Sequence, residues 1–223
     1  MIKLGGHLFA RGAPDVDLIR GYARVIRETH DASDRWVVVV GGGDPARTYI
    51  QAARTLGADE VTCDEIAITV TRIHAALMLL ALGEQAYPEV VKDIESLRRA
   101  LAVRSIAVAG GLWPGQSTFA VSAVCAGAIR ADRLIVATDV RGVYDRDPKL
   151  HADAKLIPSM TYDELLARLG EVSHMAGEYR LVDSVGLTVL KRSRVRLLFV
   201  DGTDPENVRR AVLHGEAGTT VEP

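Results

Sequence analysis

Three strand-like segments of this chain end in consecutive glycines, and each is followed by a pattern that predicts a helix. The glycines stand at positions 5–6, 41–43 and 110–111. Residues 36–40 and 105–109 are almost continuously apolar, which is typical of strands buried on both faces of a parallel sheet. Because strands alternate with helices to the end of the chain, we expect an α/β fold, a three-layer αβα sandwich around a mostly parallel central sheet.

The spacing of apolar residues also predicts where the elements begin and end. Strands are expected over residues 1–4, 36–40, 105–109, 133–137 and 195–200, and helices over residues 15–30, 46–56, 64–82, 89–100, 118–129, 161–169, 181–192 and 205–213. In this scheme Asp44 caps a helix that begins at Pro45 and stops at Gly57, and Thr161 caps a later one.

Composition limits the class of protein. The 223 residues are 48% hydrophobic and 25% charged with a net charge of −2, which excludes a disordered chain and gives no overall basic field for nucleic acid or an anionic membrane. We find no signal peptide and no apolar stretch of the about 18 residues that a spanning helix needs, so we expect a soluble cytoplasmic protein. Cys63 and Cys125 lack CxxC spacing, which favours reduced thiols and leaves a disulfide between them open.

The glycine junctions are expected to meet at one edge of the sheet, because the carboxyl ends of parallel strands lie together. Glycines there let backbone N–H groups approach an anion, and the helix that opens at Ser117 and Thr118 adds a positive terminus and two hydroxyls. The alternative is an ordinary loop in which Ser117 only caps its helix. No G-x-G-x-x-G or G-x-x-x-x-G-K-[ST] motif occurs, which disfavours a dinucleotide-binding dehydrogenase and a Walker-type ATPase. The six histidines have no ligand spacing, so no protein-built metal site is expected.

Charged residues near these junctions are candidates for contacts with an anion. Lys3 lies one residue before Leu4 and the first glycine junction, where we expect it to point to the sheet's carboxyl edge. The alternative is an exposed lysine on an edge strand. Asp64 could be only a helix cap and Arg72 only a solvated residue, and Asp147 could serve only to form a turn.

Several motifs taken together suggest a family. Residues 110–118 read Gly-Gly-Leu-Trp-Pro-Gly-Gln-Ser-Thr, and residues 142–148 contain Gly-Val-Tyr followed by Asp-Pro. The glycine triple is followed closely by Ala46 and Arg47, and residues 176–179 and 181–183 read AGEY and LVD. With these motifs the chain resembles, over essentially its whole length, the amino acid kinase superfamily and within it the archaeal-type UMP kinases.

This resemblance implies transfer of the γ-phosphoryl group of ATP to UMP, with Mg²⁺ on the phosphates, as a step of pyrimidine nucleotide biosynthesis. By the same resemblance Lys3 is the catalytic residue that neutralises the transferring group, Asp64 meets the ribose and Arg72 meets the UMP phosphate. The implied ATP-binding residues are Gly6, His7, Gly43, Arg47, Thr138, Tyr144 and Asp147, and the implied UMP-binding residues are Gly42, Asp64, Arg72, Leu112, Trp113, Pro114, Gly115, Gln116, Ser117 and Thr118.

The resemblance further implies a single domain over residues 1–223, with the acceptor nucleotide held by about residues 1–130 and ATP by about residues 131–223. It implies a homohexamer whose ligands are UMP and ATP, with neither nucleic acid nor membrane as a partner.

The chain departs from that family at three places. Gly5 stands where the family usually has serine, and His7 stands where many members carry lysine or serine, so a second cation for the phosphates depends on protonation of His7. Arg141 replaces a frequent aspartate and His74 a frequent asparagine, and we assign neither of them a role in catalysis.

Other functions of the same fold stay open. The acceptor could be isopentenyl phosphate, an aminomethylfuran phosphate or an amino acid, although the amides and hydroxyls of residues 114–118 suit a uracil edge better than an isoprenoid. A non-catalytic nucleotide-binding or oxyanion-binding protein is a further alternative, against which Lys3 and the two nucleotide motifs argue.

Overall fold

The structure is a computed structural model that describes residues 1–31, 33–172 and 182–223. One sheet of seven strands runs through it in the order β5-β4-β1-β6-β8-β9-β7. All neighbouring strands are parallel except β8 and β9. The strands are β1 (Ile2–Leu4), β4 (Trp36–Val40), β5 (Ile106–Ala109), β6 (Arg133–Thr138), β7 (Ser159–Thr161), β8 (Arg196–Asp201) and β9 (Thr219–Glu222), and a separate ribbon pairs β2 (Ala10–Arg11) with β3 (Ala13–Pro14).

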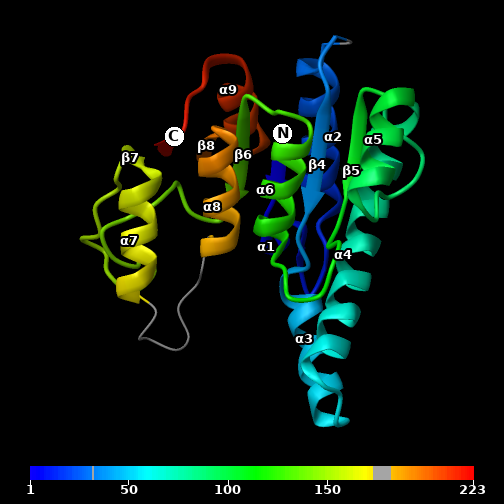
Figure 1. The fold of residues 1–223 in the computed structure, drawn as a ribbon, viewed down its shortest axis with the longest axis horizontal. Helices are drawn as coiled ribbons and strands as arrows, with labels where there is room; N and C mark the ends of the chain where they lie inside the picture. Colours follow the sequence, from blue (N-terminus) through cyan, green and yellow to red (C-terminus); the bar gives the residue numbers. More distant parts are fainter. Residues whose placement is uncertain (32, 173–181) are drawn as a thin grey trace.

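Helices cover both faces of this sheet. They are α1 (Gly6–Phe9), α2 (Val16–Thr29), α3 (Gly43–Thr55), α4 (Glu60–Leu82), α5 (Ile94–Val103), α6 (Thr118–Ala128), α7 (Tyr162–Val172), α8 (Ser184–Ser193) and α9 (Pro205–His214), and Gly83–Gln85 is a 3₁₀ turn. One core joins α2, α4 and α9 to one face of the strands, and two further clusters join α5, α6, α7 and α8 to the other. The predicted αβα sandwich is therefore confirmed (Figure 1).

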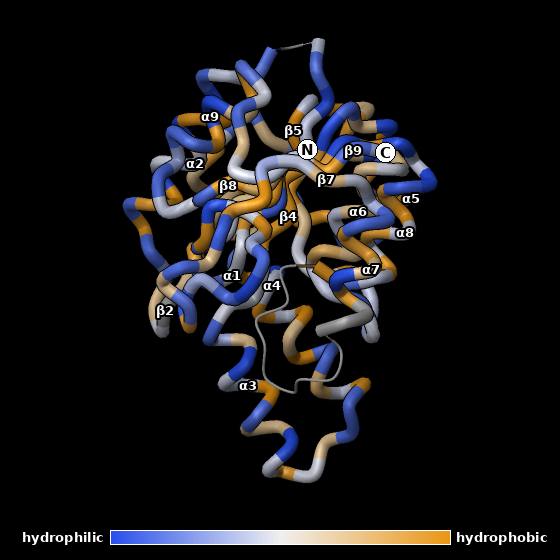
Figure 2. The backbone as a smooth tube through the Cα atoms, turned by 90° about the vertical axis from the view of Figure 1, so that its left-hand side faces the viewer, coloured by the Kyte–Doolittle hydropathy of each residue, from blue (hydrophilic) through white to orange (hydrophobic). Residues whose placement is uncertain are grey.

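The position of β1 decides what Lys3 can be. This strand lies between β4 and β6, with Lys3 opposite Val39 and Val136, so the alternative of an exposed lysine on an edge strand is wrong. Strands β4 and β5 are buried at every position, as their continuous apolar runs predict. Hydrophobic residues accordingly gather in the middle of the body (Figure 2).

Two helix starts differ from the prediction. Helix α3 begins at Gly43, one residue before Asp44, whose carboxylate pairs with Arg47 at 3.1 Å instead of capping the helix. Helix α4 begins at Glu60 because Asp59 caps it through the Thr62 amide at 2.9 Å. Asp64 is consequently one turn inside α4, and its interpretation as a cap is wrong.

Other boundaries differ for equally local reasons. Ala86 and Val91 each form an isolated bridge to β5, so α5 begins only at Ile94, after a capping box formed by Asp93 and Ser96. Helix α8 begins at Ser184, and the start predicted at 181 lies outside the described residues. The short polar strands β7 and β9 and the ribbon β2–β3 have no apolar run and were not predicted. The caps at Ser117 and Thr161 are confirmed, and both cysteines are buried free thiols.

Helices α3 and α4 pack together and project from the body (Figures 1 and 2). Residues 60–85 contain an 18-residue window with a mean hydropathy of 1.8. By length and composition this segment could cross a membrane, so the expectation that the chain has no such stretch is wrong. One face of α4 nevertheless packs in the core through Ala75, Met78 and Leu82, and core helices of globular proteins meet the same criterion.

Candidate functional site

The first two glycine junctions touch each other at the carboxyl edge of the sheet. A Cβ added to Gly6 would lie 1.9 Å from the Gly43 nitrogen, and one added to Gly41 would lie 2.6 Å from the Gly6 nitrogen. Gly43 also has a φ of +61°, which side chains rarely adopt. These positions therefore require glycine, and the loops after β1 and β4 bring their backbones together as phosphate-binding loops do.

The third junction is held by helix α4. Thr71 Oγ1 accepts from the Gly111 amide at 2.6 Å and donates to the Ile68 carbonyl, and a Cβ on Gly110 would lie 2.6 Å from the same oxygen. From the same helix, His74 Nδ1 lies 2.9 Å from the Gly41 carbonyl oxygen. Because a carbonyl oxygen can only accept, Nδ1 must carry the proton of this buried hydrogen bond. One helix thus ties together the loops that follow β4 and β5.

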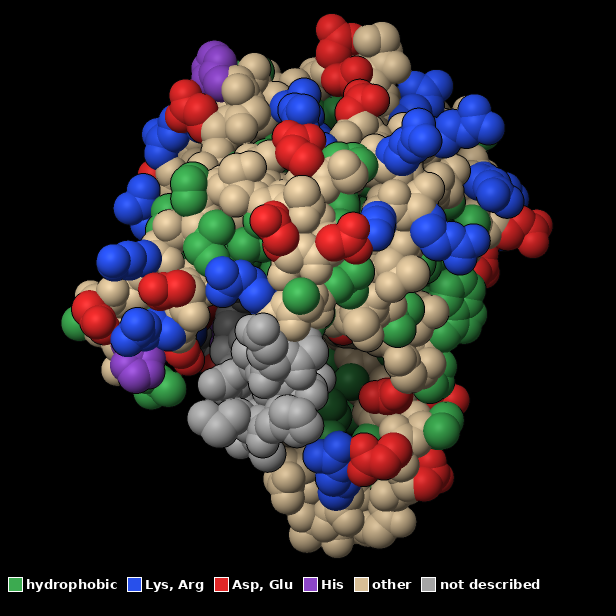
Figure 3. Space-filling view, turned by 60° about the vertical axis from the view of Figure 1, so that its left-hand side comes forward, with side chains coloured by type: hydrophobic (Ala, Val, Ile, Leu, Met, Phe, Trp, Pro, Cys, Tyr) green, Lys and Arg blue, Asp and Glu red, His purple; other side chains and the backbone are tan. Residues whose placement is uncertain are grey.

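Asp64 and Arg72, the two charged residues of α4 that are predicted to bind UMP, contact the loop of residues 110–118. Arg72 donates from Nε to the Gly111 carbonyl at 3.1 Å and from Nη2 to the Leu112 carbonyl at 3.3 Å. Asp64 Oδ2 accepts from the Gly115 amide at 2.6 Å. The sequence-predicted residues Asp64, Arg72 and 112–115 are therefore gathered in one place, on the side of the body from which the α3–α4 pair projects; Figure 3 shows a hollow between that pair and the body.

Two helix N-termini face this edge and share one hydrogen-bond network. Ser117 Oγ accepts from the Ala120 amide at 3.0 Å and donates to Asp183, which caps α8 through the Gly186 amide at 2.8 Å. In the same loop, Gln116 Oε1 is buried and no donor among the described residues reaches it. This loop therefore combines a positive helix terminus with an unused acceptor.

Lys3 lies on the central strand β1, and the charges of two carboxylates reach it. Burial lowers the pKa of Lys3 to about 8, while the charges of Asp139 at the end of β6 and of Asp183 oppose that shift. A lysine with this pKa stays mostly protonated at neutral pH yet is only weakly hydrated, a suitable state for binding a phosphoryl group.

His7 does not supply a second charge. Its pKa is lowered by burial first and by the neighbouring Arg47 guanidinium second, and Asp44, 3.4 Å from Nδ1, only partly opposes this. Arg47 contacts the His7 ring and pairs with Asp44 at 3.1 Å. His7, Arg47 and Asp44 therefore form one cluster in which His7 is mostly neutral at pH 7.

The predicted ATP-side residues follow β6. Thr138 is buried at the end of that strand. The Tyr144 backbone forms a bridge with Leu156, and Asp147 Oδ1 accepts from the Lys149 amide at 2.8 Å, so Asp147 also forms the turn that was its alternative role. The closing motif of residues 176–179, together with residue 181, lies outside the described residues.

Five residues of this edge were missed by sequence reasoning: Thr71, His74, Asp139, Lys149 and Asp183. Lys149 Nζ lies 2.6 Å from Asp139 Oδ2. Asp183 stood inside the LVD motif quoted for the family, and Thr71 stands seven residues after Asp64 on one face of an apolar helix, a signal that could have revealed it.

Glycine-lined amides, a lysine at the end of a central strand and two helix N-termini at one sheet edge define a phosphotransferase that handles phosphorylated small molecules. The sequence pattern of the amino acid kinase family matches residues 1–201, and the chain belongs to that family. Uridylate kinase from Methanothermobacter thermautotrophicus is 44% identical over 93% of this chain and 92% of its own length.

Further relatives agree with this assignment. Uridylate kinase from Hyperthermus butylicus is 44% identical over 99% of this chain and 96% of its own length. The crystal structure of uridylate kinase from Archaeoglobus fulgidus superposes with a TM-score of 0.86 at 32% identity, covering 99% of both chains. The resemblance seen in the sequence is thereby confirmed.

Proposed function

We propose that this chain transfers the γ-phosphoryl group of ATP to UMP, giving UDP and ADP. The similarity to uridylate kinases over the whole chain supports this reaction. The structural observation that carries the proposal is the set of tethers from α4, which hold the 110–118 loop and the glycine triple at the edge of the sheet where β1, the strand of Lys3, also ends.

Phosphoryl transfer asks little covalent chemistry of the protein. A phosphate oxygen of UMP attacks the γ-phosphorus, the bond to the β,γ-bridging oxygen breaks, and the electron pair leaves on ADP. The amides of Gly6 and Gly43 and the ammonium of Lys3 would stabilise the charge that spreads over the transferring group. No general base is needed, because the attacking oxygen is already anionic.

The acceptor nucleotide would be held on the α4 side of the edge. Gln116 Oε1, which lacks a donor among the described residues, can accept from the N3–H of uracil, whereas cytosine presents only a lone pair there. Asp64 is already bound to Gly115, so it would hold the ribose with its second oxygen and the loop with its first. Arg72 keeps unused N–H groups for the UMP phosphate after binding Gly111 and Leu112.

Magnesium would arrive with ATP. No group of three or more His, Cys, Asp or Glu side chains in the described part of the chain could hold a metal ion by itself. Mg²⁺ commonly binds through one or two carboxylates, water and substrate phosphates, and the carboxylates of this edge that could take part are Asp139 and Asp183, whose charges reach Lys3. The ion would neutralise phosphate charge.

Self-association is part of this proposal. The outer face of α4 leaves Ile73 57% and Leu80 79% exposed in a helix of high mean hydropathy, which supports burial of that face against other copies of the chain, as in a homohexamer. We expect sedimentation velocity to give a multiple of the 24.1 kDa chain mass and the substitution Leu80→Glu to reduce it. A monomeric wild-type protein would contradict this part. A cytoplasmic location and a place in pyrimidine biosynthesis belong to the same proposal.

The decisive experiment measures ADP release with Mg-ATP against UMP, CMP, dUMP, AMP, GMP, isopentenyl phosphate and an aminomethylfuran phosphate. We expect UMP to be phosphorylated far faster than the rest. A higher rate with one of the last two compounds would assign a different acceptor within the family, and ATP binding without ADP release from any compound would indicate a non-catalytic nucleotide-binding protein.

A further inference from the structure

A cavity of about 700 Å³ opens at the amino edge of the sheet, opposite to the candidate site. Arg133 and Arg196, which line it, begin strands β6 and β8, whereas the glycine loops follow the carboxyl ends of the strands. Figure 1 shows α6 and α8 ending on this side of the molecule, near both chain termini. The charged side chains that line the cavity are Arg130, Arg133, Arg194, Arg196, Asp132 and Glu222.

The ends of two neighbouring helices bring two of these arginines to the cavity. Helices α6 and α8 pack against each other, and a Cβ added to Gly127 of α6 would lie 2.8 Å from Ser193 Oγ of α8, so this glycine permits the close approach. Each helix closes with the same two backbone hydrogen bonds, donated by Arg130 and the next residue in α6 and by Arg194 and the next residue in α8. Both arginines therefore leave their helices in the same way, beside the cavity.

Arg130 and Arg194 adopt a backbone conformation that favours glycine. Both have a φ of +53°, and in the described part of the chain no other residue except glycine has a positive φ. Glycine is the usual residue at this position after a helix, because a Cβ is unfavourable there. A cation near a helix C-terminus is attracted by the helix dipole, but α8 already has Lys191 and Arg192 in its last turn for that purpose. An arginine at both positions therefore indicates a use of the side chain beyond closing the helix.

The cavity carries more positive charge than its own carboxylates neutralise. Arg196 pairs with Glu222 at 2.9 Å. Arg133 donates to a backbone carbonyl oxygen at 3.3 Å, which leaves its charge uncompensated. The side chains of Arg130 and Arg194 form no hydrogen bond or ion pair within residues 1–31, 33–172 and 182–223. Three guanidiniums therefore remain against one side-chain carboxylate and the terminal carboxylate of the chain.

We propose that this cavity binds an oligophosphate, either free or as the phosphate chain of a nucleotide. A guanidinium presents N–H groups in a planar fork that matches a phosphate with two hydrogen bonds, and Arg130 and Arg194 can each supply one fork. The Ser193 hydroxyl in the same lining adds a neutral donor. The cavity volume is in the range of pockets that hold small molecules, and a chain of phosphates lets arginines from both helix ends share one ligand.

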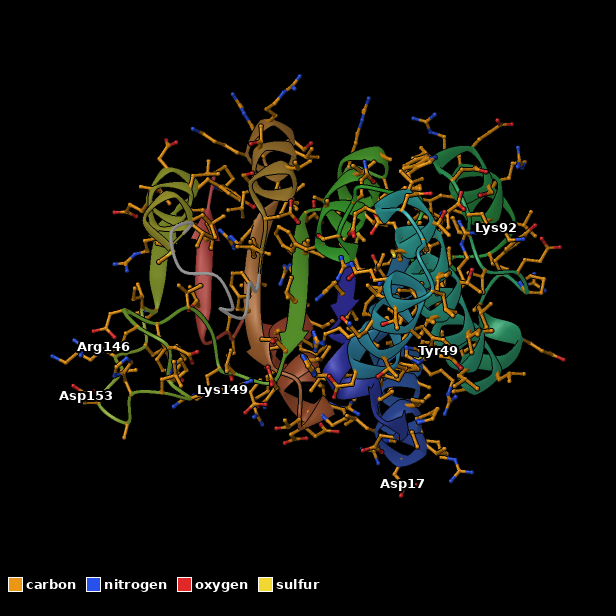
Figure 4. All side chains as sticks on the ribbon, turned by 90° about the horizontal axis from the view of Figure 1, so that it is seen from below. Asp17, Tyr49, Lys92, Arg146, Lys149 and Asp153 are labelled. Atoms are coloured by element: carbon orange, nitrogen blue, oxygen red, sulfur yellow. The ribbon has the colours of Figure 1, made fainter. Side chains whose placement is uncertain are left out.

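The test titrates inorganic triphosphate into the protein by calorimetry, with UMP and a non-hydrolysable ATP analogue saturating the candidate site. Arg130→Gly and Arg194→Gly remove the guanidiniums and give the backbone the residue that it favours, so neither should lower the melting temperature. We expect each to raise the Kd for triphosphate about tenfold, the scale of one hydrogen bond to a charged group, and the double variant to lose binding. Lys92→Ala, which removes a cation beside α5 at the other end of the sheet (Figure 4), should keep the Kd within about twofold.

The same titration with UTP and ATP identifies the source of the phosphates. A Kd within about threefold of that for triphosphate would show that the phosphate chain alone is bound, and a Kd at least about tenfold lower for one nucleotide would show that its base or ribose is bound as well. The proposal is overturned if wild-type protein binds no triphosphate at millimolar concentration, or if the double variant binds it as the wild type does. It is also overturned if Lys92→Ala weakens binding as much as Arg194→Gly, because only net charge would then matter. These outcomes concern the amino edge and leave the proposed kinase activity unaffected.

Discussion

The depressed pKa of Lys3 makes the enzyme sensitive to alkaline pH. The ordinary pKa is 10.5, and burial lowers it to about 8 in the folded protein. In the proposed mechanism the charged form stabilises the transferring phosphoryl group, so activity should be present below pH 8 and lost as the pH rises through that value. An exposed lysine would keep its charge about two pH units further.

The size of the effect follows from the titration of one group. If Lys3 titrates at about 8, about a tenth of the free enzyme carries the charged form at pH 9, so kcat/KM should be about tenfold below its plateau at pH 9 and fall about tenfold more by pH 10. Bound phosphates favour the ammonium, so the decline in kcat should begin at higher pH than the decline in kcat/KM. Asp139→Asn removes the carboxylate that most opposes the shift and should move the decline to lower pH.

The assay is a pH series of kcat/KM for UMP between pH 7 and pH 10, where the UMP phosphate, with a second pKa of about 6, no longer titrates. Lys3→Arg is the control, because a guanidinium stays charged throughout this range. Its kcat/KM should be lower than that of the wild type but independent of pH up to 10. The reasoning is refuted if wild-type kcat/KM is flat to pH 9.5, or if Lys3→Arg shows the same decline.

Three further outcomes follow from the contacts at this edge. Lys3→Met should abolish turnover yet raise the free energy of unfolding at pH 7 by about 3 kcal/mol in urea titrations, because the pKa shift from 10.5 to about 8 is a folding cost of that size; a less stable variant would contradict the burial of that charge. Asp64→Ala frees the Gly115 amide and should raise the KM for UMP in initial-rate assays, with the KM for ATP nearly unchanged. A change confined to the KM for ATP would show that Asp64 belongs to the ATP site instead of the UMP site. Thr71→Val should cost about 1–3 kcal/mol of stability in the same urea titrations by leaving the Gly111 amide unpaired, and Thr71→Ser should restore it; equal losses in both would show that the methyl group, not the hydroxyl, matters.

The fold was predictable because its signals are local. The buried strands β4 and β5 have apolar residues at every position, and β1 and β4 are followed by the glycines that the close approach of Gly6 to Gly43 requires. The boundaries were less predictable where a segment that binds a neighbouring strand replaces a helix, as before Ile94, because such a segment gains its hydrogen bonds from residues distant in the sequence.

The candidate site was predictable only as a set of parts. Lys3, Asp64 and Arg72 were identified from residue type and family resemblance. The sequence around Asp64 and Arg72, however, does not indicate that both form hydrogen bonds with the loop of residues 110–118. A hydrogen bond such as that from Gly111 to Thr71 joins residues 40 positions apart, and its partners cannot be paired without the packing of α4 on the sheet.

Helix α4 explains why the site depends on residues that touch no reacting atom. Three of its polar side chains, Asp64, Thr71 and His74, bind two different loops. Thr71 and His74 are buried, and a buried polar group costs free energy unless it is paired, so both must find their partners when the loops are correctly placed. The cost of leaving them unpaired therefore favours one relative position of the glycine triple and the 110–118 loop. Alignment of two bound nucleotides, on which phosphoryl transfer depends, is in this way set by the interior face of one helix.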